Sequence, residues 1–196
     1  RWRAVENEIA RLHAAGRPVL VGCRTIERSQ QLAAQLDRCQ IHYQLLNGKQ
    51  TAAEAEVIAR AGRQGAVTIA TNMAGRGTDI QLAPGVAELG GLHLIGIERN
   101  DSRRIDRQLT GRVARQGDPG SYQFFVSADD ALVQVHGPTI GQRIKSIPNE
   151  AGEVPADLSG EICAMQGLAE SAAFRLRQEL AAADTWLCDE LGELLQ

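Results

Sequence analysis

Two segments that combine glycine and arginine hold the residue types and spacings best suited to chemistry. In the first, TNMAGRGTD at 71–79, Gly75 and Gly77 flank Arg76. Glycine on both sides lets a loop present one guanidinium outward, and Asp79 can accept hydrogen bonds from that loop or pair with an arginine. A solvated arginine in a glycine-rich turn has the same pattern, so this segment alone leaves both interpretations open.

The second segment is RRIDRQLTGRVARQG at 103–117, within a stretch at 99–115 that has six arginines and two aspartates. Its spacings of four, four and three residues predict one shared helical face, formed by Arg104, Gln108, Arg112 and Arg115. Guanidinium groups suit phosphate oxygens because each offers several donors in a rigid fork. A solvated cationic face is the ordinary alternative, but a second arginine segment at the same edge of a sheet favours an anionic ligand.

Short apolar runs that alternate with helical patterns predict an α/β fold, in which a parallel sheet is flanked by helices. Strands are expected at 18–22, 42–47, 66–70, 92–97 and 122–126. Helices are expected at 2–15, 25–38 and 101–115, and TAAE at 51–54 predicts a capped helix start. Ligand sites of such sheets lie beyond the carboxyl ends of the strands, so the loops after Gly22, Ala70 and Ile97 are expected to hold the site.

The carboxyl-terminal part of the chain departs from this pattern. Pro138, Pro148 and Pro155, together with several glycines, predict a linker or surface loop at 137–156. Apolar residues at helical spacing beyond Leu158 predict a single helix of about nine or ten turns. A helix of that length cannot bury its apolar side within this domain, so we expect it to pack outside.

The composition is that of a soluble globular protein, with 43% hydrophobic residues, 23% charged residues and a net charge of −3. Charged and polar residues interrupt every apolar run before the roughly 18 residues of a membrane span, and the first residues lack a secretory pattern. The four cysteines include no C-x-x-C pair. They predict buried thiols in a reducing, cytoplasmic compartment, and neither a disulfide framework nor a metal site.

A phosphate-binding loop requires a glycine-rich sequence that ends in Gly-Lys-Ser or Gly-Lys-Thr. The only Gly-Lys pair, Gly48-Lys49, is followed by Gln50, and Tyr43 stands where the first glycine belongs. No acidic pair follows an apolar strand in the manner of a magnesium site. The chain therefore has arginines that could bind the phosphates of a nucleotide but no loop that would cradle them.

Several longer strings resemble the SecA family of protein-export motor ATPases. They are TIATNMAGRGTDI at 68–80, GGLHLIG at 90–96, SRRID at 102–106 and QGD at 116–118. In the tail, Gln166, Glu170 and Phe174 resemble the start of that family's long helical scaffold. The likeness covers nearly the whole chain, and its strings are longer than a general helicase signature.

The resemblance implies a RecA-like fold. It further implies that the chain is the carboxyl-side domain of a motor with two such domains, of the superfamily 2 helicase type. It also implies three segments: a second nucleotide-binding motor domain at 1–137, a linker at 138–156 and the start of the helical scaffold at 157–196. ATP with Mg²⁺ would lie in the cleft between two motor domains. Because a first domain absent from this chain would hold most of the nucleotide, the chain alone is expected to be inactive.

By the same resemblance, Arg76 and Arg112 would be catalytic arginine fingers that reach the γ-phosphate. The residues implied to line the nucleotide are Gly75, Gly77, Asp79, Gln108, Arg115 and Gln116. The whole motor would drive preproteins across the cytoplasmic membrane, as a cytoplasmic ATPase peripheral to the inner face of that membrane. Its implied partners are the first motor domain, the preprotein and the translocation channel, with a homodimer allowed and no nucleic acid expected.

Four residues depart from the family pattern: Thr110, Val113 and Ala114 stand where an arginine and a Ser-Gly pair are usual, and Cys23 replaces a usual threonine. Two alternatives stay open. A stand-alone, non-catalytic or regulatory module would explain the missing phosphate loop. Half of a nucleic-acid helicase would share the motor motifs, although a net charge of −3 and an aromatic content of 4% argue against it.

Overall fold

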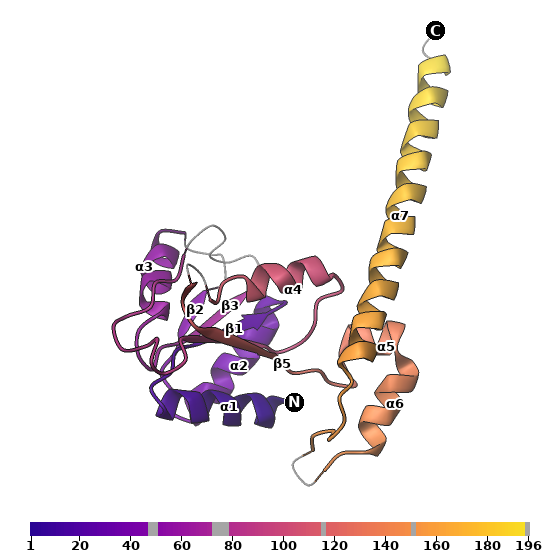
Figure 1. Cartoon of the computed structure of the whole chain (residues 1–196). Helices are drawn as coiled ribbons and strands as arrows, with labels where there is room; N and C mark the ends of the chain where they lie inside the picture. Colours follow the sequence, from indigo (N-terminus) through magenta and orange to yellow (C-terminus); the bar gives the residue numbers. More distant parts are fainter. Residues whose placement is uncertain (47–50, 72–78, 115–116, 150–151, 195–196) are drawn as a thin grey trace.

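A five-stranded parallel sheet lies between two layers of helices, and a long helix projects away from it (Figure 1). The computed structural model describes residues 1–46, 51–71, 79–114, 117–149 and 152–194, with side chains described except at 51–54 and 187–194. The strands are β1 (Val19–Cys23), β2 (Gln44–Leu46), β3 (Val67–Thr71), β4 (Leu92–Gly96) and β5 (Gly120–Phe124). The helices are α1 (Trp2–Ala14), α2 (Ile26–Arg38), α3 (Thr51–Ala61), α4 (Arg103–Thr110), α5 (Ala131–His136), α6 (Pro138–Ser146) and α7 (Ser159–Leu194).

The sheet has the strand order β2-β3-β1-β4-β5, and every neighbouring pair is parallel. In the register, Val21 of β1 lies between Ile69 of β3 and Ile95 of β4. All residues of β1, β3 and β4 are buried, as expected for apolar runs covered on both faces. The predicted α/β fold with a helix-flanked parallel sheet is confirmed.

Each face of the sheet has its own hydrophobic core, because successive side chains of a strand point to opposite sides. Val19 and Val21 of β1 pack on one face with residues of α1 and α2. Leu20 packs on the other face with residues of α3 and α4. The central strand therefore belongs to both cores, and its carboxyl end is held from both sides.

Helix α4 is shorter than the helix predicted at 101–115. It ends at Thr110, with Gly111 as its C-cap. Beyond the cap the chain turns more tightly, since the Arg112 N–H donates to the Leu109 carbonyl, three residues back, at 3.1 Å. Glycine at this position has a low helix propensity and favours a helix end, which explains the early stop.

The shared helical face predicted for the arginines is only partly formed. Arg104 and Gln108 lie four residues apart on α4, and both are exposed. Arg112 follows the helix, so its predicted place on that face is wrong. Arg115 lies outside the described residues.

Two short helices, α5 and α6, precede the long helix. Helix α6 covers Pro138–Ser146 of the segment 137–156, so the expectation of a loop is wrong for this part, while the linker role stays a prediction. Pro138 stands in the first turn of α6, where the N–H that proline lacks would have no carbonyl partner within the helix. Pro148 and Pro155 lie outside helices, as predicted.

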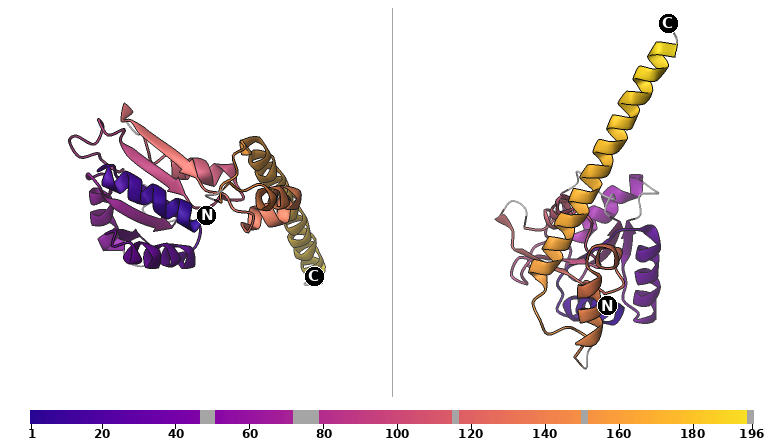
Figure 2. Two further views of the ribbon diagram at one scale, coloured as in Figure 1. Left: turned by 90° about the horizontal axis from the view of Figure 1, so that it is seen from below. Right: turned by 90° about the vertical axis from the view of Figure 1, so that its right-hand side faces the viewer.

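Helix α7 extends over 36 residues, which is the predicted length of about ten turns. Its base packs on α5 and α6 in a third core, to which Met165 and Ala169 contribute from α7. Beyond residue 172 its described side chains are exposed, and the helix extends away from the sheet (Figure 2). Within the described part of the chain, no helix combines the length and the apolar character of a membrane span.

Candidate functional site at the carboxyl ends of the strands

The first arginine segment follows the carboxyl end of β3, as expected for a parallel sheet. The predicted catalytic Arg76 and its neighbours Gly75 and Gly77 lie outside the described residues. The segment ends at Asp79, which is half-buried. Ile80 follows, is 7% exposed, and belongs to the core beneath α3 and α4. Ile80 thus anchors the far end of this segment to the sheet.

The second arginine segment begins with α4, beyond the carboxyl end of β4. Its N-cap is Ser102, whose hydroxyl accepts a hydrogen bond from the Arg104 N–H at 3.3 Å. Toward the other end of α4, Leu109 lies close to Gly22 of β1. A β-carbon added to Gly22 would be 2.5 Å from a Leu109 methyl carbon. The missing side chain at Gly22 therefore lets α4 approach the carboxyl end of β1, where ligands bind in this class of fold.

Arg112 lies in the turn after α4 and is half-buried. The next residue, Val113, is 8% exposed and packs in the same core as Leu109. Ala114 then has a left-handed backbone conformation, with φ of +57°. Leu109 and Val113 tie the turn to the sheet on either side of Arg112, whereas its direct neighbour Gly111 is exposed.

The described site residues offer donors suited to phosphate and one acceptor. Arg112 supplies a guanidinium and Gln108, exposed on α4, supplies a carboxamide. Asp79 supplies a carboxylate that can orient an arginine. Arg115 and Gln116, which the sequence also predicts at this site, lie outside the described residues.

An arginine links the loop after β1 to the loop after β4. The Arg24 guanidinium donates to both carboxylate oxygens of Asp101, at 3.0 and 2.7 Å. Close to this pair, Glu98 is 9% exposed. Burial raises the pKa of its carboxyl group, and the nearby charge of Asp130 raises that pKa further. The edge of the sheet next to the arginine segments therefore carries charges that are partly withdrawn from water.

Three of the four cysteines have described side chains, and they only partly follow the prediction of buried thiols; the side chain of Cys188 lies outside the described part. Cys23, at the end of β1, is buried, and burial raises the pKa of its thiol to about 12. Its burial makes this thiol part of the packing at the end of β1. Cys39 and Cys163 are exposed, contrary to the prediction.

A buried polar junction that was not predicted from the sequence joins α4 to α7. At its centre is Asp106, 4% exposed. Its Oδ1 accepts hydrogen bonds from the backbone N–H and the side-chain amide of Asn100, at 3.1 and 2.8 Å. Its Oδ2 accepts from Arg99 at 3.1 Å and from Nε2 of Gln166, on α7, at 2.7 Å. The carboxylate is thus hydrogen-bonded on both oxygens, by two segments besides its own helix.

One turn further along α7, Glu170 contacts the first residues of α4. Its Oε1 accepts from the Arg103 backbone N–H at 2.8 Å and from the Ser102 hydroxyl at 3.2 Å. Its Oε2 accepts from the Arg103 guanidinium at 3.0 and 3.1 Å. A carboxylate at the start of a helix also interacts favourably with the helix dipole. The available sequence signal was Gln166 itself, a polar residue beside the apolar Met165 and Ala169.

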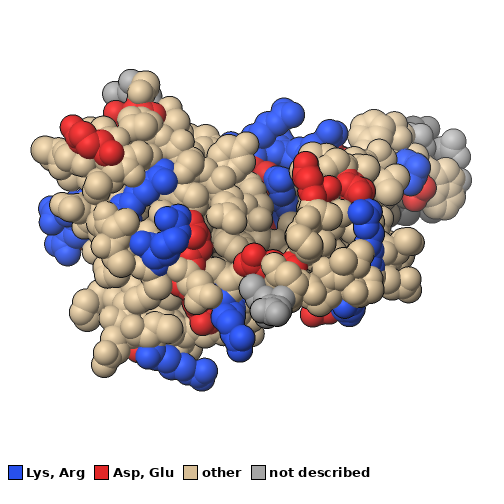
Figure 3. Space-filling model, turned by 60° about the horizontal axis from the view of Figure 1, so that its bottom comes forward, with Lys and Arg blue, Asp and Glu red and all other residues tan. Residues whose placement is uncertain are grey.

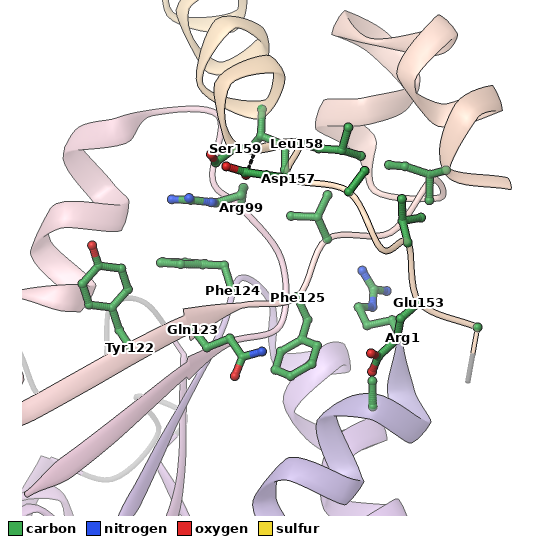
Figure 4. A pocket seen from close by; sticks show the side chains of 17 residues that line it. Arg1, Arg99, Tyr122, Gln123, Phe124, Phe125, Glu153, Asp157, Leu158 and Ser159 are labelled. Atoms are coloured by element: carbon green, nitrogen blue, oxygen red, sulfur yellow. Dashed lines mark hydrogen bonds between the residues drawn. The ribbon is translucent and has the colours of Figure 1, made fainter. Parts of the chain in front are cut away.

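A cavity of about 420 Å³ lies beside this junction, between β5, the start of α1 and the segment before α7 (Figure 4). Arg99 lines it, with its guanidinium 4.1 Å from the ring centre of Phe124. Asp157, also in the lining, accepts a hydrogen bond from the Ser159 N–H at 2.9 Å and so caps α7. None of its described lining residues is a predicted site residue, so the cavity is separate from the proposed nucleotide site.

Sequence comparisons connect the chain to one family. A profile of the SecA P-loop domain matches residues 1–87 and 83–152. The protein translocase subunit SecA of Thermosipho melanesiensis is 48% identical over 193 residues, which cover 95% of this chain and 22% of that protein. The protein translocase subunit SecA 2 of Geobacillus thermodenitrificans is 53% identical over 146 residues, which cover 74% and 18% respectively. The chain thus spans about a fifth of the length of these curated relatives.

Solved structures share the fold at lower sequence identity. The E. coli DEAD-box protein SrmB, in complex with RraA, aligns with a TM-score of 0.52 and 23% identity, covering 78% of this chain and 89% of that chain. The yeast DEAD-box splicing factor Prp28 aligns with a TM-score of 0.55 and 16% identity, covering 83% and 34%. These likenesses show a RecA-like helicase fold alone. The profile match, which extends over most of the chain, shows more: this chain belongs to the SecA family.

Proposed function

We propose that this chain is the carboxyl-side motor domain of a SecA-like ATPase that drives preproteins across the cytoplasmic membrane. The main support is the match to the SecA profile, together with a parallel sheet whose strand ends lead into both arginine segments. The curated relatives carry the name protein translocase subunit. Because the chain corresponds to about a fifth of their length, translocation is proposed for the longer protein of which this chain would be a part.

In this proposal Arg76 and Arg112 are arginine fingers for the γ-phosphate of ATP. The residues that line the same cleft are Gly75, Gly77, Asp79, Gln108, Arg115 and Gln116. The half-buried Arg112, on a turn packed into the core, supports this role because a finger must be held in place to stabilise charge in the transition state. Such a finger contributes about 10³–10⁵ in turnover.

ATP with Mg²⁺ is held mainly by a first motor domain in this proposal. The donors described in this chain fit phosphate oxygens better than a metal ion, because they are a guanidinium and a carboxamide. The only Gly-Lys pair is followed by Gln50, so it does not complete a phosphate loop. Within the described ranges, no three His, Cys, Asp or Glu residues lie together as a metal site would require.

The proposed division places the motor domain at 1–137, a linker that contains α6 at 138–156, and the start of the helical scaffold at 157–196. Large apolar side chains exposed on α7 support a scaffold that packs against other parts of the motor; they are Leu168, Phe174, Leu176, Leu180 and Trp186. The partners are the first motor domain, the preprotein and the translocation channel, with a homodimer allowed. The motor would be cytoplasmic and peripheral to the inner face of the cytoplasmic membrane.

The decisive experiment compares Arg112→Ala with Arg107→Ala in the full-length protein. Arg107 is exposed on α4 and lies outside the proposed site, so it is the matched control. We expect Arg112→Ala to lower kcat for ATP hydrolysis by about 10³-fold or more, with little change in KM. Arg107→Ala should keep the turnover of the unchanged protein. Turnover retained in Arg112→Ala would reject Arg112 as a finger.

The mass of the native product separates the motor from a stand-alone regulatory module. The motor requires a native protein several times longer than this chain, whereas a product of 196 residues would favour the module. For the helicase alternative, RNA or DNA binding that weakens steeply with salt would be the expected result. On the face shown in Figure 3, basic and acidic side chains are interspersed, which supports our expectation of no nucleic-acid partner there.

A further inference from the structure

We propose that Gln166 and Glu170 of α7 are positioning residues for Arg112. They fix the start of α4, and through α4 they fix the turn that carries the arginine. This inference rests on the function proposed above, and it assigns a role to two residues that lie outside the proposed nucleotide site.

The two residues attach α7 to α4 at two points. Gln166 and Glu170 are four residues apart and therefore lie on the same face of α7. Glu170 binds the first residues of α4 through the Arg103 backbone and guanidinium. Gln166 binds Asp106, one turn further along α4. Two contacts one turn apart restrain the rotation of α4 about its axis as well as its position.

The far end of α4 has a different support. Leu109 is 6% exposed and packs in the core against the position of Gly22 in β1. Arg112 follows Leu109 by three residues. The helix is therefore held at its start by α7 and near its end by the sheet. A displacement of α7 would tilt α4 about the Leu109 contact and move the guanidinium that follows it.

The hydrogen bonds of Gln166 favour a positioning role over a purely stabilising one. The amide nitrogen of Gln166 points to the Asn100 carbonyl and to Asp106, because both of these partners are hydrogen-bond acceptors. Its Oε1 then points elsewhere and is buried without a partner among the described residues. A packed apolar side chain could fill the same space without leaving a buried oxygen unpartnered, but it would form no hydrogen bond to Asp106. What the amide adds is a fixed direction toward Asp106.

The test uses the full-length protein and measures kcat and KM for ATP together with hydrogen exchange of the backbone amides at 103–112. Gln166→Met keeps the length of the side chain and removes both hydrogen bonds. We expect kcat to fall about 10- to 100-fold, as for a small misplacement of a catalytic group, with KM nearly unchanged. Exchange at 103–112 should become faster. Gln178→Met, the same substitution at an exposed position of α7, should change neither quantity.

A second variant covers the case in which Gln166→Met does not fold. Glu170→Ala removes the more exposed contact and should lower kcat to a smaller extent, again with KM retained, whereas Glu179→Ala on the exposed part of α7 should not. Unchanged kcat in either folded variant would overturn the inference. Arg112→Ala is measured in parallel: if it is inactive while the α7 variants are fully active, the proposed function stands and only the positioning role fails. If Arg112→Ala retains turnover, the proposed finger itself fails.

Discussion

The side-chain nitrogen of Gln166, in α7, lies 2.7 Å from Oδ2 of Asp106, in α4, although the two residues are 60 positions apart in the chain. Asp106 also accepts hydrogen bonds from Asn100, in the loop after β4. A single carboxylate thus connects the sheet, the helix that precedes Arg112 and the long helix. This arrangement makes Asp106 a sensitive point of the structure.

Replacing Asp106 should destabilise the chain strongly. In Asp106→Ala the half-buried Arg99 and the buried Asn100 and Gln166 each lose a hydrogen bond to this carboxylate, and we expect a loss of about 3 kcal/mol in the free energy of unfolding. The matched control is Asp129→Ala, which removes an exposed ion pair with Lys145 and should cost no more than about 1 kcal/mol. Urea unfolding followed by circular dichroism measures both. Equal losses would show that the junction does not contribute beyond a surface contact.

The close approach of α4 to β1 predicts that a single methyl group at Gly22 is harmful. Because the added β-carbon would lie 2.5 Å from a Leu109 methyl carbon, Gly22→Ala should destabilise the chain by about 1–3 kcal/mol. Combined with Leu109→Ala the two losses should be less than additive, since the small side chain makes room. Gly160→Ala is the control, because an added β-carbon there meets no atom within 4 Å. Additive losses would contradict the predicted contact.

The protonation of His93 should make stability depend on pH in a defined direction. Burial, with the charge of Arg17, lowers the pKa of its ring to about 4, below the roughly 6.5 of an unfolded chain. The folded state therefore binds fewer protons between these values. The His93 contribution is complete above about pH 6.5 and is lost as the pH falls toward 4, by at most about 1.4 kcal/mol per pH unit.

The measurement is the difference between the unfolding free energies of the unchanged chain and His93→Gln from pH 4 to pH 8. Glutamine can still form a hydrogen bond toward Ser121, which lies 2.7 Å from Nδ1 of His93, but it does not titrate. We expect the difference to shrink as the pH decreases. A difference that is constant over this range would show that His93 does not titrate differently in the folded chain.

The three cysteines whose side chains the structure describes should react in two classes. Cys39 and Cys163 are exposed and should be alkylated by a maleimide within minutes, whereas Cys23 is buried and should react only after unfolding. Mass spectrometry of the peptides after timed labelling at pH 7 distinguishes them. Labelling of Cys23 at the rate of Cys163 would mean that the end of β1 opens readily. A rate that rises with urea in step with unfolding is the expected result.

The fold could largely be predicted because its signals are local. A buried parallel strand is a short apolar run, and β1, β3 and β4 are such runs. The strand order was not predicted, because it depends on crossovers and on which strand pairs with which. The start of α6 was missed since proline was interpreted as a helix breaker, although it is well suited to the first turn of a helix.

The candidate site was less predictable than the fold. The spacing of Arg104, Gln108 and Arg112 indicated one helical face, but Gly111 ends the helix before Arg112. Gln166 stands out as a polar residue beside apolar ones, but its partner Asp106 could not be predicted, because a contact across 60 residues depends on where α7 docks. The resemblance to the SecA family did point to Gln166 and Glu170 as family-like residues, and the structure adds what they bind.

The length of α7 amplifies whatever happens at its base. From Gln166 to the end of the helix at Leu194 there are 28 residues, or about 42 Å of rise. If the helix stays straight, a rotation of about 10° at the Asp106 contact sweeps its far end through about 7 Å. The same lever works in reverse. The arm from Gln166 to the tip is about 42 Å and the spacing of the two anchoring residues is about 6 Å, so a sideways load at the tip acts on the anchoring contacts about sevenfold amplified. A force on the far end of α7 would thus reach Arg112 through the side chains of Gln166 and Glu170.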